Sequence, residues 1–145
     1  QASFDLLGQY RNPLWAIEDN DAGILVVQTA VDLGYPNLYF RDAEQAAAQG
    51  KAPSKPGWHT DESNRWSLWG ECIELVASGG LTVPSAAGLE QFFGVIKNPD
   101  RLGRIEGMDG SKDDYPMAVA GAYRLRKHVH VRVGNMKPAV VTRSW

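Results

Sequence analysis

The apolar runs and polar breaks of the first forty residues predict a parallel β-α-β unit. A brief apolar run ends at "EDND", as a buried strand ends at a polar rim. Asn20 or Asp21 can cap the helix that follows, and Gly34 stands where a helix C-terminal glycine belongs. We expect a helix at 3–10, a strand at 14–18, a helix at 22–33 and a strand at 37–41. Strand, helix and strand joined by tight turns indicate α/β architecture with a right-handed crossover.

The rest of the chain alternates helical patterns with short extended runs. Residues 42–57 contain two prolines and read as a mobile loop. Thr60 or Asp61 can cap a helix whose apolar stripe has spacings of three and four, at Trp66, Trp69, Ile73 and Val76. After it we expect a strand at 81–84, a helix from 85 that becomes extended near 95–96, a hairpin or loop at 97–112, a long helix from Asp113 or Asp114, and an alternating strand at 128–133.

Composition agrees with one globular domain. The chain has 145 residues, of which 43% are apolar, and no run approaches the roughly twenty apolar residues that span a bilayer. The first residues lack a basic region followed by an apolar stretch, so we expect no secretory signal. There is no initiator Met, which suggests a processed product or an excised fragment. The single cysteine, Cys72, favours a reducing compartment and an inert thiol.

Charge is distributed unevenly. The last 31 residues carry a net +6, whereas the first 114 carry a net −8. This split suggests an end that faces a polyanion. An equally good interpretation is that Arg124, Arg126 and Lys127 lie in the last turn of a helix, where positive charge interacts favourably with the helix dipole.

Two acidic clusters could carry chemistry. Glu18 opens "EDND" at the end of a predicted strand, the edge where α/β folds place their sites. Asp113 and Asp114 precede Pro116, which is tolerated only in the first turn of a helix, so the pair lies at a helix start. A helix cap explains one aspartate, and taken alone it is the better interpretation. If the two clusters meet, their oxygens suit Mg²⁺ or Mn²⁺.

Several other residues have a structural interpretation beside a functional one. His128 and His130 have a spacing that zinc sites use, but a solvated strand face is the better reading. Trp66 and Trp69 are expected in the core, whereas Trp58 could be partly exposed and stack on nucleotides. The glycines of "GRIEGMDGSK" fit a hairpin turn as well as a phosphate cradle.

The ordered set of motifs resembles the C-terminal nuclease domain of phage large terminases. "AIEDNDAG" at 16–23 is similar to its "E-x-N-N-x-G" strand-end motif. "GWHT" at 57–60, then "GGLTVP" and a helix ending in "QFF", follow its order, and "KDDYPMAVAGA" is similar to its "H-D-D-x-x-M-A-x-A" helix. The resemblance covers roughly residues 4–127, and the set is specific where each piece alone is weak.

The resemblance implies an RNase H-like three-layer domain, with a mixed sheet flanked by helices, at 1–127, followed by a C-terminal strand and basic tail at 128–145. It implies cleavage of concatemeric double-stranded DNA during genome packaging in the host cytoplasm. Glu18, Asp113 and Asp114 would be the catalytic and metal-binding residues, holding two Mg²⁺ or Mn²⁺ ions. The cations expected to contact DNA phosphates are Arg104, Lys112, Arg124, Arg126 and Lys127. Implied partners are a terminase ATPase domain, the small subunit and the portal, with no membrane.

The chain departs from the family pattern in two places. Lys112 stands where His often precedes the aspartate pair, and the strands that carry the first aspartate of the family would lie before residue 1. We therefore expect an N-terminally truncated nuclease domain that leaves supercoiled plasmid intact with Mn²⁺. Possible substitutes for that aspartate are Asp5, Asp19, Asp21 and Asp109. The alternatives are a non-catalytic module that binds DNA or the portal, and another RNase H-like nuclease such as a resolvase.

Overall fold

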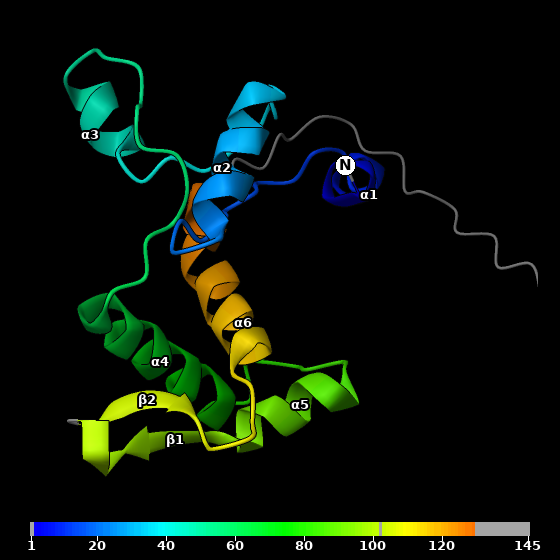
Figure 1. The fold of residues 1–145 in the computed structure, drawn as a ribbon, viewed down its shortest axis with the longest axis vertical. Helices are drawn as coiled ribbons and strands as arrows, with labels where there is room; N and C mark the ends of the chain where they lie inside the picture. The colour runs from blue at the N-terminus through cyan, green and yellow to red at the C-terminus, as the bar shows by residue number, and fades with distance from the viewer. Residues whose placement is uncertain (1, 102, 130–145) are drawn as a thin grey trace, which may run out of the picture.

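A computed structural model describes residues 2–101 and 103–129 of the chain. Its helices and strands are α1 (Ala2–Gln9), α2 (Gly23–Asp32), α3 (Ala43–Ala48), α4 (Glu62–Ala77), α5 (Ala86–Phe93), β1 (Val95–Asn98), β2 (Arg104–Gly107) and α6 (Asp114–Leu125), with 3₁₀ turns at Pro99–Arg101 and Arg126–His128. In Figure 1, α1, α2 and α3 lie at one end, α4, α5 and the hairpin at the other, and α6 runs between them. Within the described ranges, no helix is long and apolar enough to cross a membrane.

The predicted parallel pairing is present as isolated bridges. Trp15 pairs in parallel with Leu38, and Glu18 pairs in parallel with Trp58. Backbone bonds join the segments, with Tyr39 N donating to Trp15 O at 2.9 Å and Trp58 N to Ile17 O at 2.7 Å. The prediction of a mixed α/β class is therefore confirmed. The described residues form a sheet only at the antiparallel pair β1–β2, so the expected broad mixed sheet is not seen there.

Helix α2 begins without the predicted side-chain cap. Ala22 occupies the N-cap position and makes no side-chain cap bond, so the prediction of Asn20 or Asp21 as the cap is wrong. Asn20 instead donates to Glu18 Oε1 and Thr60 O, and the next residue, Asp21, has a positive φ of 45°. Gly34 has a φ of 66° after the helix, as expected of a C-terminal glycine.

Helix α4 begins as predicted but buries a different face. Asp61 caps it through a reciprocal capping box with Asn64. The buried residues are Leu68, Trp69 and Cys72, whereas Ile73 is 58% exposed and Val76 is 52% exposed. Trp66 is also exposed, and Lys97 Nζ lies 5.0 Å from its ring centroid. The predicted stripe is therefore right only at Trp69, because the buried face is turned toward residues 65, 68, 69 and 72.

The region predicted as a loop at 42–57 contains the short helix α3. Asp42 immediately precedes α3 and accepts hydrogen bonds from Ser54 N and Oγ and from Lys55 N. These bonds bring the two ends of the segment at 42–55 together. Desolvation raises the pKa of the Asp42 carboxyl, but the bonds from Ser54 and Lys55 together outweigh it and hold the pKa below its usual value. The strand expected at 81–84 is not formed, since these residues make no ladder.

The C-terminal elements follow the predicted order. Ser85 caps α5 by accepting from Gly88 N, and the extended run at 95–98 pairs with 104–107 as the expected hairpin. Helix α6 packs on α4 and α5. Gly88 permits the second contact, since a Cβ there would lie 2.6 Å from the Tyr115 ring. The strand predicted at 128–133 begins with His128 in a 3₁₀ turn, and its residues from 130 onward lie outside the described range.

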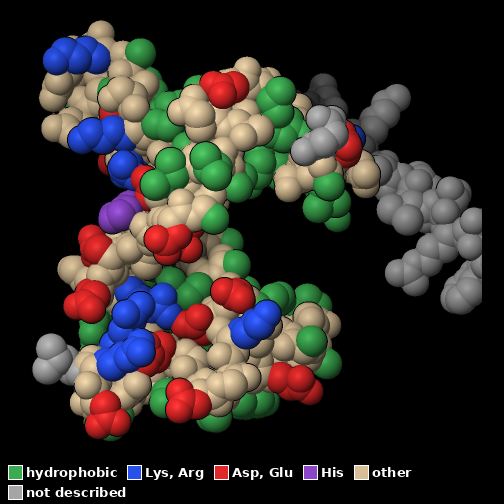
Figure 2. Space-filling model, in the orientation of Figure 1, with side chains coloured by type: hydrophobic (Ala, Val, Ile, Leu, Met, Phe, Trp, Pro, Cys, Tyr) green, Lys and Arg blue, Asp and Glu red, His purple; other side chains and the backbone are tan. Residues whose placement is uncertain are grey.

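Two hydrophobic clusters hold the fold. One is built from Leu68, Trp69, Cys72, Ile105 and Ala120. The other is built from Ile17, Val27, Ala30 and Tyr35, with Phe4, Trp15 and Tyr35 in edge-to-face contact at 5.2–5.5 Å between ring centroids. Figure 2 shows the molecule narrowed between its two ends. The clusters leave a groove between the segment at 14–18 and α6.

Candidate functional site

The three predicted catalytic carboxylates line one groove. It has a volume of about 600 Å³ and is lined by Glu18, Asp113 and Asp114. Its other walls come from the segments at 14–16 and 58–60, from α4 and from α6, including Trp58, Thr60, Arg65, Leu68, Met117, Ala118, Gly121 and Ala122. The small residues of α6 leave space along the wall that the carboxylates border. About 95 residues of sequence separate Glu18 from the aspartates, so the fold creates this juxtaposition.

Glu18 is exposed but held by its surroundings. Its backbone pairs with Trp58, and Asn20 Nδ2 donates to Glu18 Oε1 at 2.9 Å and to Thr60 O at 3.0 Å. Gly23 allows α2 to begin directly against Glu18, since a Cβ at this position would lie 1.8 Å from the Glu18 carbonyl oxygen. The glycine of "EDNDAG" is therefore a steric requirement for the position of Glu18.

Asp113 and Asp114 have different environments. Asp113 is at the N-cap position of α6, but its side chain makes no cap hydrogen bond. Gln91 of α5 serves the helix start instead, accepting from Tyr115 N at 3.0 Å. The Asp113 side chain forms an ion pair with Arg65, whereas Asp114 is exposed at the first helical position. The interpretation of the pair as a simple side-chain cap is thus not what the geometry shows.

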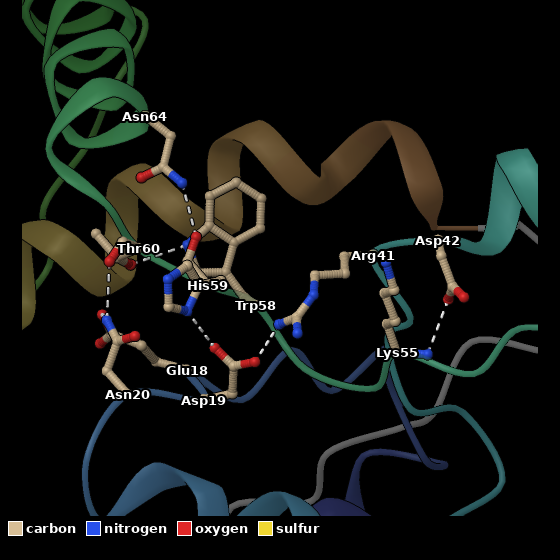
Figure 3. Close-up of polar contacts among 10 residues, drawn as sticks. All are labelled: Glu18, Asp19, Asn20, Arg41, Asp42, Lys55, Trp58, His59, Thr60 and Asn64. Carbon is tan, nitrogen blue, oxygen red and sulfur yellow. Dashed lines mark hydrogen bonds and ion pairs between the residues drawn. The ribbon is translucent and has the colours of Figure 1, made fainter.

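A second polar cluster surrounds Asp19, beside the groove (Figure 3). Asp19 Oδ1 accepts from His59 Nδ1 at 2.8 Å, and Oδ2 forms an ion pair with Arg41. Burial raises the pKa of Asp19, but the bonds from Arg41 and His59 outweigh this and hold the pKa below its usual value. The Asp19 side chain is 14% exposed. The cluster fastens the segment at 57–60 to the one at 17–19.

The predicted DNA-binding cations fall into two groups at opposite ends of α6. Arg104 lies on β2, where it is 3.5 Å from Glu106, and Lys112 is exposed before α6. The other three lie at the far end of the helix, which is about 18 Å long, with Arg124 in its last turn and Arg126 and Lys127 after it. Arg124 is paired with Glu71 at 2.7 Å and also bonds Ser67, so it joins α6 to α4. Bonds from Arg124 lower the pKa of Glu71. The Arg126 guanidinium stacks on Tyr123, with Cζ 3.6 Å from the ring centroid, and Lys127 is exposed.

The other candidate residues have structural surroundings. Trp58 is half-buried in the groove and its Nε1 donates to Thr60 Oγ1 at 3.1 Å. Cys72 is buried, and burial raises the pKa of its thiol, as expected of an inert cysteine. His128 lies against the Tyr39 ring, and its Nδ1 is 3.6 Å from a Glu44 carboxylate oxygen. His130, its partner in the "HxH" spacing, lies outside the described residues.

The groove carboxylates fit a divalent metal in kind but not in spacing. Carboxylate oxygens are the donors that Mg²⁺ and Mn²⁺ prefer. Among residues 2–101 and 103–129, no group of three acidic, histidine or cysteine side chains is close enough to hold a metal ion. Asp113 is also already paired with a cation, Arg65.

Sequence reasoning missed Arg65, Arg41 and His59. Arg65 could have been found, because residues 65, 68, 69 and 72 have the spacings of one helix face and the last three are apolar. The partners of Arg41 and His59 carry no such signal, since both reach Asp19 across 22 and 40 residues. Comparisons with protein-family models, with curated proteins and with solved structures find no match for this chain.

Proposed function

We propose that this chain carries metal-binding carboxylates of a divalent-metal-dependent DNA endonuclease of the RNase H-like type found in phage large terminases. The observation that supports the proposal most is that Glu18, Asp113 and Asp114 line one groove. Glu18 belongs to one motif of the resemblance and the two aspartates to another, and nothing in the local sequence requires the two motifs to meet. The proposed substrate is double-stranded DNA during genome packaging in the host cytoplasm, with a terminase ATPase domain, the small subunit and the portal as proposed partners.

Within this proposal the chain's residues have distinct tasks. Glu18 and Asp114 are the exposed carboxylates that would hold Mg²⁺ or Mn²⁺, and Asn20 keeps Glu18 oriented toward the groove. When bound, two such ions activate water and stabilise the leaving oxygen of a phosphodiester. Lys112 and Arg104 lie at the α6 start and on the hairpin, where they would attract the phosphate backbone.

The test is calorimetric titration of the purified chain with Mn²⁺, with Glu18→Gln as the matched variant. The wild-type chain should bind Mn²⁺, and the variant should bind it on the order of a hundred-fold more weakly, because a hard-oxygen ligand is lost. Supercoiled plasmid should stay intact with Mn²⁺, since the described carboxylates form no closed metal site. Robust nicking that Glu18→Gln abolishes would overturn this second expectation and support the enzyme directly.

The alternative proposal is a non-catalytic module that binds DNA or the portal. The ion pair between Arg65 and Asp113 favours it, because this pair neutralises one groove carboxylate without a metal. No heat of Mn²⁺ or Mg²⁺ binding, together with DNA binding that a chelator leaves unchanged, would establish the module over the nuclease. A preference for four-way junctions over linear duplex would instead indicate a resolvase.

A further inference from the structure

Arg65 connects three elements at the edge of the groove. It projects from α4, its Nε donates to Ile105 O on β2 at 2.7 Å, and its Nη2 pairs with Asp113 at the start of α6. Its side chain is 15% exposed. Because a guanidinium is a planar fork with fixed donor directions, one side chain can hold the hairpin and the helix start together.

The contact with Arg65 separates the two adjacent aspartates. Asp113 is 23% exposed and commits an oxygen to a largely buried guanidinium, whereas Asp114 is exposed and lines the groove. Removing one member of such a pair leaves the other charge desolvated, which is costly. Breaking the Arg65–Asp113 pair would therefore be costly, so Asp113 should keep this contact when a cation enters the groove.

We infer that Arg65 is a positioning residue that holds Asp113 as its internal counter-ion and leaves Asp114, with Glu18, as the groove carboxylates open to a cation. The inference rests on the proposed function for the identity of that cation. It assigns the two aspartates different roles, one anchoring α6 and one facing the ligand. It also ties the hairpin to the groove, since Arg65 serves both.

The test is a double-substitution cycle read by Tb³⁺ luminescence, with excitation of the tryptophans, of which Trp58 lines the groove. Asp114→Asn should weaken Tb³⁺ binding on the order of a hundred-fold, because a ligand is lost. Arg65→Gln should tighten it by about five-fold and Asp113→Asn should weaken it by about five-fold, through charge alone. The double variant Arg65→Gln with Asp113→Asn should return to within about two-fold of wild type.

A second cycle, thermal unfolding without metal, tests the anchor itself. Each single substitution should lower the unfolding temperature, and the double variant should lower it by less than the sum. Arg65→Lys keeps the charge but cannot serve both acceptors, so it should lower the unfolding temperature while Tb³⁺ affinity stays near that of wild type.

The outcomes separate the inference from the function on which it rests. A double variant that loses Tb³⁺ binding as Asp114→Asn does would make Asp113 a ligand and overturn the inference. Wild type that takes up no Tb³⁺ would defeat the proposed function, and the metal-free cycle then decides the anchor alone. If the changes in unfolding temperature add in that cycle, Arg65 does not anchor Asp113. If the double variant loses less than the sum, the anchoring role is supported.

Discussion

Asp19 and Glu18 are adjacent in sequence but do different work in the fold. Glu18 lines the groove, whereas Asp19 bonds Arg41 and His59 (Figure 3). The two bonds cross from the segment at 17–19 to residues far along the chain. Asp19 is therefore a link that fixes the strand end from which Glu18 projects.

The pairing of Asp19 predicts a stability that depends on pH. We expect Asp19→Asn to lower the free energy of unfolding at pH 7 by about 1–2 kcal/mol, since charged hydrogen bonds are weakened. The folded pKa of Asp19 lies below its ordinary value of 3.8, so its contribution is present above that value and is lost as pH falls through the folded pKa. Thermal unfolding followed by circular dichroism should therefore show the deficit at pH 7 and a smaller one near pH 3.

Asp109→Asn is the matched control, because Asp109 is exposed in a turn. It should change the free energy of unfolding by less than about 0.5 kcal/mol at either pH. A deficit for Asp19→Asn that stays the same at both pH values would show that the charge of Asp19 contributes nothing.

Sequence reasoning identified the groove carboxylates but not the residues that hold them. Glu18, Asp113 and Asp114 stand in motifs whose spacing is local, so they can be read directly. The contacts of Arg65 with Asp113 and of His59 with Asp19 join residues 48 and 40 positions apart. No local pattern encodes such pairs, because they depend on how whole elements pack.

At the scale of elements, some helix ends could be predicted from local sequence, whereas the caps of α2 and α6 and the buried face of α4 could not. Asp61, Ser85 and Gly34 mark helix ends by chemistry that acts within four residues. The face that α4 buries depends on contacts with α6 and the hairpin. The sequence of α4 offers two faces with helical spacing, one that includes Arg65 and one that includes Trp66. Helix α3 was missed because prolines nearby suggested a loop, although its own sequence is rich in alanine.

Replacing glycine by alanine should have opposite effects on stability at Gly23, which lies against Glu18, and at Gly70, which lies on the exposed face of α4. Gly23→Ala should cost at least about 3 kcal/mol of unfolding free energy, because its Cβ would lie 1.8 Å from a backbone oxygen that no rotamer change can move. Gly70→Ala, in the exposed face of α4 with nothing within 4 Å, should stabilise by about 0.5–1 kcal/mol. Chemical denaturation of both variants measures the difference, and equal effects would contradict the described packing.

At the scale of the whole molecule, the uneven charge of the sequence is partly cancelled by folding. Arg124 belongs to the basic end, but its guanidinium is paired with Glu71 of the acidic part. Arg101 and Arg104 are paired with Glu106, whose pKa is lowered by its bond from Asn98 and by these arginines. Among the described residues, Arg124 therefore offers less free charge to a polyanion than its place in the basic part of the sequence suggests.

This cancellation predicts which substitutions affect DNA binding. Lys112→Gln should weaken binding to duplex DNA and reduce the salt dependence by about one phosphate contact. Arg124→Gln should leave DNA affinity within about two-fold and lower the unfolding temperature instead, because it breaks a bridge between α6 and α4. Fluorescence anisotropy across a salt series, beside thermal unfolding, checks both. A larger loss of affinity for Arg124→Gln than for Lys112→Gln would restore Arg124 as a DNA contact.

The long reach of Arg65 has a consequence for how the chain is made. Leu68, Trp69 and Cys72 of α4 are covered by Ile105 and Ala120, and Arg65 meets Asp113 only 48 residues later. At the usual pace of translation those residues take roughly 2–10 s to emerge. During this interval the apolar face of α4 is not yet covered by the elements that bury it in the folded chain. Chaperone binding or aggregation of nascent chains should therefore begin when α4 leaves the ribosome and end when α6 follows it.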